Sequence, residues 1–210
     1  AGGQVDAESE TPTGLMLGTG TRVVATEKLH AQGNIITTEN ALDLAISGDG
    51  YFSVQQADGT IAYSRDGSFK LSADGNLVTA GGQAVLPAIT VPQNAASLTI
   101  GRDGIVTVEL ANGGGSSQIG QLQLSRFVNN SGLQPIGRNL MQQTNASGDP
   151  LVVLPGADGA GMLMQGALEA SNVNVVEEMV NMIETQRAYE VNSKAISAAD
   201  GMLRFLNNNL

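Results

Sequence analysis

The C-terminal segment from Leu168 to Leu210 constrains the fold more than any other stretch of the sequence. It has no proline and a single glycine, Gly201, a composition that favours one uninterrupted helix. Asn174 followed three residues later by Glu177 is the pattern of an N-cap with a capping-box partner. A helix over about residues 175–208 is roughly 50 Å long at about 1.5 Å per residue, so it outreaches the core of a small domain.

Apolar residues recur at every seventh position of this helix. They are Val175, Met182, Tyr189, Ile196, Leu203 and Leu210. Such a strict repeat is typical of a coiled-coil seam, because seven residues bring the chain back to one face of a supercoiled helix. Further apolar residues are expected to widen the seam: Val176, Met179, Val180 and Ile183 in its first half, and Ala199, Met202, Phe205 and Leu206 in its second half.

We therefore predict an assembly interface along this helix. Its residues are Val175, Met179, Met182, Ile183, Tyr189, Ile196, Leu203, Leu206 and Leu210. We find no second long helical pattern in this sequence, and we expect the seam to need a second helix. The repeat alone also allows an alternative, in which the terminal helix packs on its own β domain.

The region before the helix has the pattern of a β domain. Leu42, Leu44 and Ile46 alternate with other residues, as expected for strands. Asp-Gly steps separate many of the short strand-like runs, and Asp-Gly favours tight turns because glycine adopts positive φ freely. Their spacing lacks the ligand pattern of a calcium loop. We predict a mainly β fold with a long C-terminal α-helix, the strands forming an antiparallel sandwich or barrel-like domain.

A block of polar residues near and within the helix has the form of a family signature. Its members are Ser171, Asn172, Asn174, Gln186, Arg187, Tyr189, Asn192, Lys194 and Asp200. In this spacing they resemble the C-terminal signature of the flagellar rod and hook proteins. The β block over residues 48–79 is also similar to that family. An acidic segment over about residues 1–13 makes the distal-rod members the most similar branch.

This resemblance implies a structural subunit of the distal rod, which polymerises into a rigid helical tube and transmits torque from motor to hook. The implied partners are further copies of the chain, proximal rod and hook proteins, and the surrounding ring proteins. The implied location is the periplasm-spanning rod, reached by export without a cleaved signal peptide. The family's first helix would be missing here. The implied division is an arm with the acidic segment over 1–33, a β domain over 34–166 and the helix over 167–210.

Two alternatives stay open at this point. The chain could be a proximal rod or hook subunit of the same family. In a different class, it could be a secreted β-rich binding module or hydrolase with a helical tail. For the second alternative the sequence offers no set of residues that forms a site.

The sequence gives little sign of chemistry. His30 is the only histidine and there is no cysteine, so we expect an isolated surface histidine rather than a zinc site or a catalytic triad. Arg65 beside Asp66 is expected to form a local surface ion pair. The net charge of −10 argues against nucleic-acid binding, and no apolar run is long enough to span a bilayer. We predict no catalytic residue, cofactor or metal site, and no membrane insertion.

Overall fold

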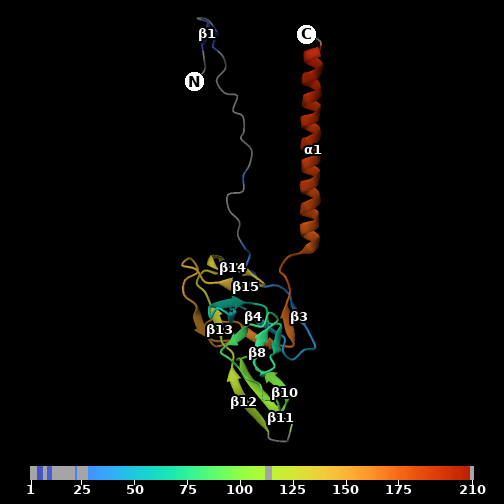
Figure 1. Ribbon diagram of the computed structural model, residues 1–210. Helices are drawn as coiled ribbons and strands as arrows, with labels where there is room; N and C mark the ends of the chain where they lie inside the picture. Colours follow the sequence, from blue (N-terminus) through green and yellow to red (C-terminus); the bar gives the residue numbers. More distant parts are fainter. Residues whose placement is uncertain (1–3, 7–8, 11–21, 23–27, 112–114, 209–210) are drawn as a thin grey trace.

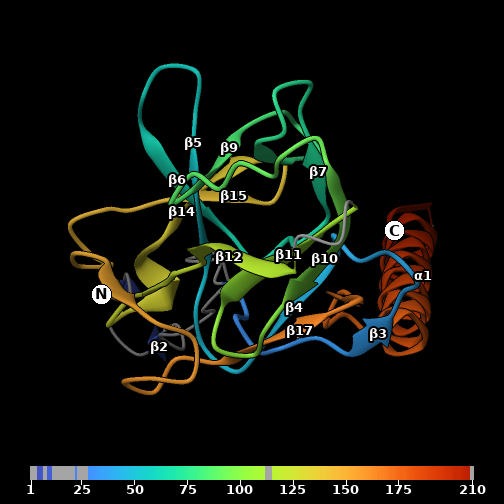
Figure 2. The same cartoon turned by 90° about the horizontal axis from the view of Figure 1, so that it is seen from below.

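The computed structural model describes residues 4–6, 9–10, 22, 28–111 and 115–208. These residues form a β domain from which one long helix projects (Figure 1). Seen along the helix axis, the helix lies to one side of the β domain, next to the strand labelled β3 (Figure 2). Most of the arm predicted over residues 1–33 lies outside the described residues, as does Leu210.

The chain contains eighteen described strands, one 3-10 turn and one α-helix. The strands are β1 (Gln4–Asp6), β2 (Ser9–Glu10), β3 (Ile35–Thr37), β4 (Leu44–Ser47), β5 (Phe52–Gln55), β6 (Ile61–Ser64), β7 (Phe69–Leu71), β8 (Leu77–Thr79), β9 (Ala84–Leu86), β10 (Ala95–Ile100), β11 (Ile105–Leu110), β12 (Ser116–Gln121), β13 (Leu124–Arg126), β14 (Gln134–Gly137), β15 (Leu140–Gln142), β16 (Leu151–Val153), β17 (Met162–Gln165) and β18 (Ala167–Glu169). The 3-10 turn is η1 (Asn130–Gly132), and the helix is α1 (Val175–Asn208).

The strands form several open antiparallel sheets. The largest has seven strands in the order β14-β15-β6-β5-β9-β8-β7, and a second has the order β10-β11-β12. Three two-stranded pairs complete the domain: β13-β16, β17-β4 and β18-β3. The pair β1-β2 lies apart from it (Figure 1). The sheets pack in a sandwich-like way and do not close into a barrel. The predicted fold class is therefore confirmed in its sandwich form.

One hydrophobic core joins these sheets. Phe52 and Phe69 meet edge to face, with ring centroids 5.0 Å apart, and both side chains are fully buried. Leu124 and Leu163 reach the same core from β13 and β17. Ala45 is also fully buried, so β4 is covered on both faces rather than on one. The core thus draws on strands from nearly the whole length of the β domain.

The Asp-Gly steps form turns for two different physical reasons. The expected positive φ occurs at the glycines of five steps in the β domain: Gly50, Gly59, Gly75, Gly104 and Gly159. Gly67 is different, because it is required for space. A Cβ at this position would lie 1.7 Å from the carbonyl oxygen of Leu44, so any side chain would push β4 away. The Leu44 amide also donates to the Gly67 carbonyl at 3.0 Å, which fixes this close approach.

Candidate assembly interface

The helix begins where the capping pattern predicts. The side-chain oxygen of Asn174 accepts a hydrogen bond from the Val176 amide at 3.2 Å, and its carbonyl accepts one from the Glu178 amide at 3.0 Å. The acidic Glu177 and Glu178 lie in the first turn, where they complement the helix dipole. The reciprocal capping-box bond expected from the Glu177 side chain does not form within the described structure. The Asn174 cap and the two acidic side chains therefore stabilise the N-terminus of a helix of 34 residues.

The predicted interface residues on α1 are uncovered. Val175, Met179, Met182, Ile183, Tyr189 and Ile196 are all exposed, by between 49% and 76% of their surface. Leu203 continues the same row, and Leu206 lies beside it near the C-terminal end of α1, but their side chains lie outside the described part of the helix, and Leu210 lies outside it altogether. The helix projects away from the β domain along its length (Figure 1). The alternative of a helix packed on its own β domain is thus wrong.

A second apolar row lies on the opposite side of α1. At 3.6 residues per turn, Val191 lies about 140° and Phe205 about 180° around the helix from Ile196. The row also includes Val176, Val180 and Met202, and these five side chains are all exposed. We expected the residues outside the strict repeat to widen a single seam. In a regular helix they do widen it, because Met179 and Ile183 lie between the strict repeat and Val176. The apolar surface of α1 therefore continues round to the side opposite Ile196.

The base of the helix is tied to the β domain by a charged clamp. Strand β18 leads into α1 and pairs antiparallel with β3, with Glu169 opposite Ile35. The Glu169 carboxylate accepts from Nε and Nη2 of Arg65, both at 2.8 Å, and the two side chains are only 11% and 19% exposed. Arg65 also donates to the carbonyl oxygens of Gly48 and Gly50, each at 3.1 Å. The clamp thus joins residues 104 positions apart. The local pair expected between Arg65 and Asp66 does not form.

Beside the clamp, Gly33 and Asn172 connect the segment that enters the β domain to the segment that leads into α1. The Gly33 amide donates to Glu169 at 2.9 Å, and a Cβ on Gly33 would lie 1.9 Å from the Ala170 carbonyl oxygen. The side chain of Asn172 donates to the carbonyls of Leu29 and Ala31 at 3.1 and 2.9 Å. Asn172 belongs to the predicted signature, and its amide serves this junction.

The other signature residues divide into two groups. Ser171 accepts a hydrogen bond from the Val173 amide at 3.2 Å, and Asn174 caps the helix. The rest are exposed on α1, away from the β domain: Gln186, Arg187, Tyr189, Asn192, Lys194 and Asp200. Ser171 and Asn174 therefore form local hydrogen bonds at the start of the helix, whereas the second group is exposed to solvent.

His30 is half-buried at this junction rather than isolated on the surface. Its Nδ1 lies 3.2 Å from the Tyr51 hydroxyl. Burial raises the pKa of Tyr51, although the neighbouring Arg65 acts in the opposite direction. The Arg65 guanidinium lies 6.0 Å from the centre of the Tyr51 ring, within the range of a cation–π contact. His30 and Tyr51 thus extend the clamp, and sequence reasoning gave no sign of this cluster.

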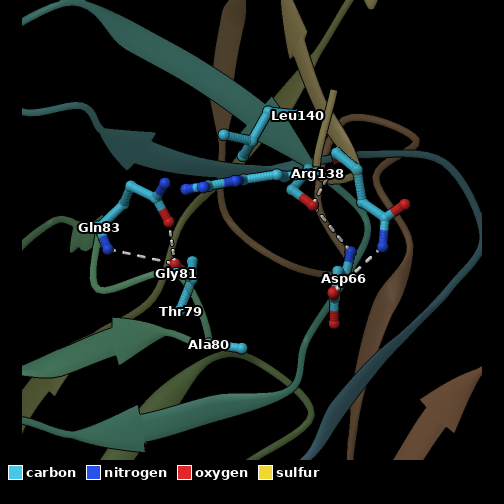
Figure 3. Close-up of a pocket in the computed structure, with 9 residues that line it drawn as sticks. Asp66, Thr79, Ala80, Gly81, Gln83, Arg138 and Leu140 are labelled. Atoms are coloured by element: carbon cyan, nitrogen blue, oxygen red, sulfur yellow. Dashed lines mark hydrogen bonds between the residues drawn. The ribbon is translucent and has the colours of Figure 1, made fainter. Parts of the chain in front are cut away.

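Two cavities lie near the clamp, and both are lined in part by Asp66 and Asn139. One, of about 480 Å³, lies between the junction and the turn after β6. The other, of about 470 Å³, is shown in Figure 3, where Arg138 extends across it toward Gln83. Burial alone would raise the pKa of Asp66, but hydrogen bonds from Ser68 and Asn139 together lower it below its usual value. The carboxylate is thus held by the turn that it stabilises.

Neither cavity assembles a recognisable reaction centre. Among the residues that the structure describes, no group of three His, Cys, Asp or Glu side chains is placed to hold a metal ion. Within the same residues, no helix combines the length and the apolar character that crossing a membrane requires. The exposed apolar residues of α1 are therefore the candidate functional site in the described part of the chain.

Two family models match the chain. The flagellar hook protein FlgE/F/G D1 domain matches residues 45–108, and the C-terminal domain of flagellar basal body rod FlgEFG proteins matches residues 164–209. The flagellar basal-body rod protein FlgG of Buchnera aphidicola subsp. Schizaphis graminum is 52% identical, over 98% of this chain and 79% of that protein. The chain belongs to the FlgG family of flagellar basal-body rod proteins. FlgG of Borreliella burgdorferi is 46% identical over 94% of this chain and 75% of that protein. FlgG of Bacillus subtilis is 38% identical over 99% of this chain and 78% of that protein.

FlgG-family membership confirms the resemblance predicted from the C-terminal signature, including its distal-rod branch. The chain is a structural subunit of the flagellar rod, located in the basal body. The C-terminal family model begins in β17 and includes Glu169 and α1, whereas Arg65 lies within the match to the D1 domain. The clamp between Arg65 and Glu169 thus joins the two matched domains. The alternative of a secreted binding module or hydrolase finds no support among these relatives.

Proposed function

We propose that this FlgG-family chain polymerises with copies of itself into the distal rod, a stiff helical tube that transmits torque from motor to hook. The observation that carries the proposal is the uncovered helix. Exposed apolar residues along 34 residues are costly in water, at about 25 cal/mol for each Å² that a partner could cover. Covering by neighbouring helices removes that cost, and the repeated seam suits such packing.

The two apolar faces favour a layer of helices over a two-stranded coil. A dimeric coiled coil buries one seam and leaves the opposite side polar. In α1, Ile196 and Phe205 lie on opposite sides and are both exposed. A helix with partners on both sides belongs to a continuous wall, and contacts of this heterologous kind generate open helical filaments. In the proposed tube, α1 lines the inside and the β domain faces outward.

The proposed division of labour follows the predicted segments. Residues 1–33 act as an arm that bridges neighbours, 34–166 as the β domain, and 167–210 as the assembly helix. The clamp at Arg65 and Glu169 holds the helix at a fixed angle to the β domain, which suits a stiff shaft. The role is mechanical and not enzymatic. Proximal rod proteins, hook proteins and the surrounding rings are the proposed neighbours, and export proceeds without a cleaved signal peptide.

Substitution of Ile196 by Asp tests this proposal in cells that rely on the full-length protein. A charge in the seam cannot be buried without a partner, so rods should be absent in electron micrographs of basal bodies. The purified variant should keep the stability of the β domain to within about 0.5 kcal/mol, because α1 does not contact the core. Ser197→Asp is the matched control, since it places the same charge about 100° around the helix from Ile196. Normal rods with Ile196→Asp, or rods lost equally with Ser197→Asp, contradict the proposal.

A further inference from the structure

The apolar residues of α1 change sides between the first and the second half of the helix. At 3.6 residues per turn, about 18 residues complete five turns, so residues 18 positions apart lie on the same side of α1. Val176 and Lys194 form such a pair, and so do Met179 and Ser197. On this side, apolar residues of the first half are therefore followed by polar residues of the second half.

The opposite side of α1 shows the reverse order. Glu177 and Ala195 lie there, 18 positions apart, and so do Glu184 and Met202. Residues 184–188 contain no large apolar side chain, so the two apolar stretches are separate. Acidic residues of the first half thus precede apolar residues of the second half on one and the same side.

These two stretches define two apolar sides of the helix. The N-terminal apolar side consists of Val175, Val176, Met179, Val180, Met182 and Ile183, and the C-terminal apolar side of Tyr189, Val191, Ala195, Ile196, Ala199, Met202 and Phe205. All of these residues are exposed. The centres of the two sides lie about 150° apart around a regular helix. Each side therefore needs its own cover, from nearly opposite directions.

One neighbouring helix cannot cover both sides at once. A closed antiparallel pair covers a single direction on each helix and leaves the other apolar side in water. Two neighbours in different directions make a head-to-tail contact instead, and such contacts generate open filaments. The arrangement of α1 therefore favours a continuing row of helices over a dimer.

The same arrangement determines which halves meet in a row of parallel helices. Each helix in such a row presents one side to the copy ahead and the opposite side to the copy behind. The N-terminal apolar side of one copy therefore faces the side of the next copy that carries the C-terminal apolar residues. If the two copies were in register, Met179 would meet Glu177 and Asn181 instead, and the acidic side chain would lose its water.

We propose that neighbouring copies of α1 pack in parallel with an axial offset of about 18 residues, or roughly 27 Å, at about 1.5 Å per residue. Residues 175–183 of one copy then lie against about residues 193–201 of the next copy. The proposal rests on the proposed function, in which copies of the chain form one helical tube. A second copy is the occupant because it carries an uncovered apolar side at the required height and in the required direction.

The charge along α1 agrees with this offset. Residues 175–184 contain three glutamates and no basic residue, so they carry a net charge of −3. Residues 185–208 contain three basic and two acidic residues, so they carry a net charge of +1. Copies in register would place the acidic segments side by side, whereas the offset places each of them beside a weakly basic segment.

Cysteine crosslinking in assembled rods of the full-length protein tests the offset. The sequence contains no cysteine, so two co-expressed chains, one with Met179→Cys and one with Ala199→Cys, carry single defined thiols. The two positions face each other at nearly the same height in the proposed row, so a short bismaleimide should link them into a dimer. Ser197→Cys is the matched control for Ala199→Cys. It lies at the same height but points away, so the effective concentration of its thiol is low, and at least about tenfold less dimer is expected.

A third pair of chains distinguishes the offset from packing in register. Met179→Cys with Asn181→Cys should give a dimer only if neighbouring copies lie at the same height. Rods that give a dimer from this pair, or none from positions 179 and 199, overturn the offset and leave the proposed function intact. Absence of rods from the wild-type chain contradicts the proposed function itself. If Met179→Cys prevents assembly, Val176→Cys with Ala195→Cys makes the same test.

Aspartate substitution gives an independent test of the change of side. Asn181 and Ala199 lie on the same side of α1, but only Ala199 is covered in the proposed row. Ala199→Asp should therefore reduce the number of rods in electron micrographs at least about tenfold, because a charge would be buried without a partner, whereas Asn181→Asp should assemble as wild type does. Circular dichroism of the purified chains checks that both variants remain folded. Equal loss of rods with the two variants would show that one side is covered along its whole length and would refute the proposal.

Discussion

The β domain and the helix α1 bury their apolar residues in different ways. In the β domain, Phe52, Leu44 and Leu163 are almost completely inaccessible to solvent, and they come from strands distant in sequence. In α1, every residue whose burial is described is exposed, although the helix is as rich in valine, methionine and isoleucine as a core segment. The β domain is complete within one chain. In the proposed rod, the exposed apolar residues of α1 are covered by further helices.

This difference separates folding from assembly within one sequence. A substitution in the β domain acts on the free energy of unfolding of the single chain. A substitution on either apolar face of α1 acts mainly on the association of chains. Only at the junction, where Arg65 binds Glu169, are both expected to change together.

We expect the largest difference in stability between the two regions when a glycine in each is replaced by alanine. Gly67→Ala places a Cβ 1.7 Å from the Leu44 carbonyl oxygen, so we expect the β domain to lose about 3 kcal/mol or more. Gly201→Ala lies in the helix, where a Cβ meets no atom within 4 Å. There the change should strengthen the helix by about 1 kcal/mol, because alanine loses less backbone entropy. Urea denaturation and far-ultraviolet circular dichroism measure the two effects.

If both alanine variants were destabilising, or both stabilising, the proposed difference between the β domain and α1 would be contradicted. If Gly201→Ala raises the helicity of the single chain but weakens rod assembly, the effects on folding and on assembly are separated at one residue. That result would show that a neighbouring chain needs the space at Gly201, which nothing in the described part of this chain occupies.

A smaller effect is expected at the junction. Glu169→Gln keeps the shape of the side chain but removes the charge that binds Arg65, and the pair is mostly buried, so we expect a loss of about 2 kcal/mol. Asp49→Asn is the matched control. Asp49 lies 3.9 Å from Arg126 and its side chain is 70% exposed, so its loss should cost less than about 0.5 kcal/mol. Hydrogen exchange of β18 should also rise in Glu169→Gln, and equal effects of the two variants would contradict a special role for the clamp.

Sequence patterns were sufficient for elements that depend on neighbouring residues. The start of α1 follows from Asn174, because a cap acts on amides two and three residues away. The turns at Gly59 and Gly75 follow from Asp-Gly pairs, because their positive φ is a local requirement. Within the described residues, α1 is the only α-helix, as the β pattern over residues 42–127 predicted. In each case the determining interactions span only a few positions.

Contacts between residues distant in the sequence could not be predicted from the sequence patterns. Arg65 precedes Asp66, and a local pair was the natural expectation, but its partner Glu169 is brought to it by the pairing of β18 with β3. The need for glycine at Gly67 depends on where β4 passes. Similarly, the pairing of β13 with β16 is apparent only once the strand order is known. The width of the apolar surface of α1, by contrast, follows from the sequence, because helix geometry alone determines it.

The smallest expected effect lies wholly within the β domain and concerns pH. The pKa of Asp66 is lowered in the folded chain, with hydrogen bonds from Ser68 and Asn139 outweighing the effect of burial. An aspartate in the unfolded chain has a pKa of about 3.9. The ionised carboxylate therefore stabilises the fold above about pH 4, and this contribution is lost as the pH falls through the lower, folded pKa. Asp66→Asn should be less stable than wild type at neutral pH, and the difference should shrink toward pH 2 in urea titrations. Because α1 does not contact Asp66, its helicity should follow the same course in both proteins, and a helix that responds to this substitution would show that the two regions are coupled through the junction.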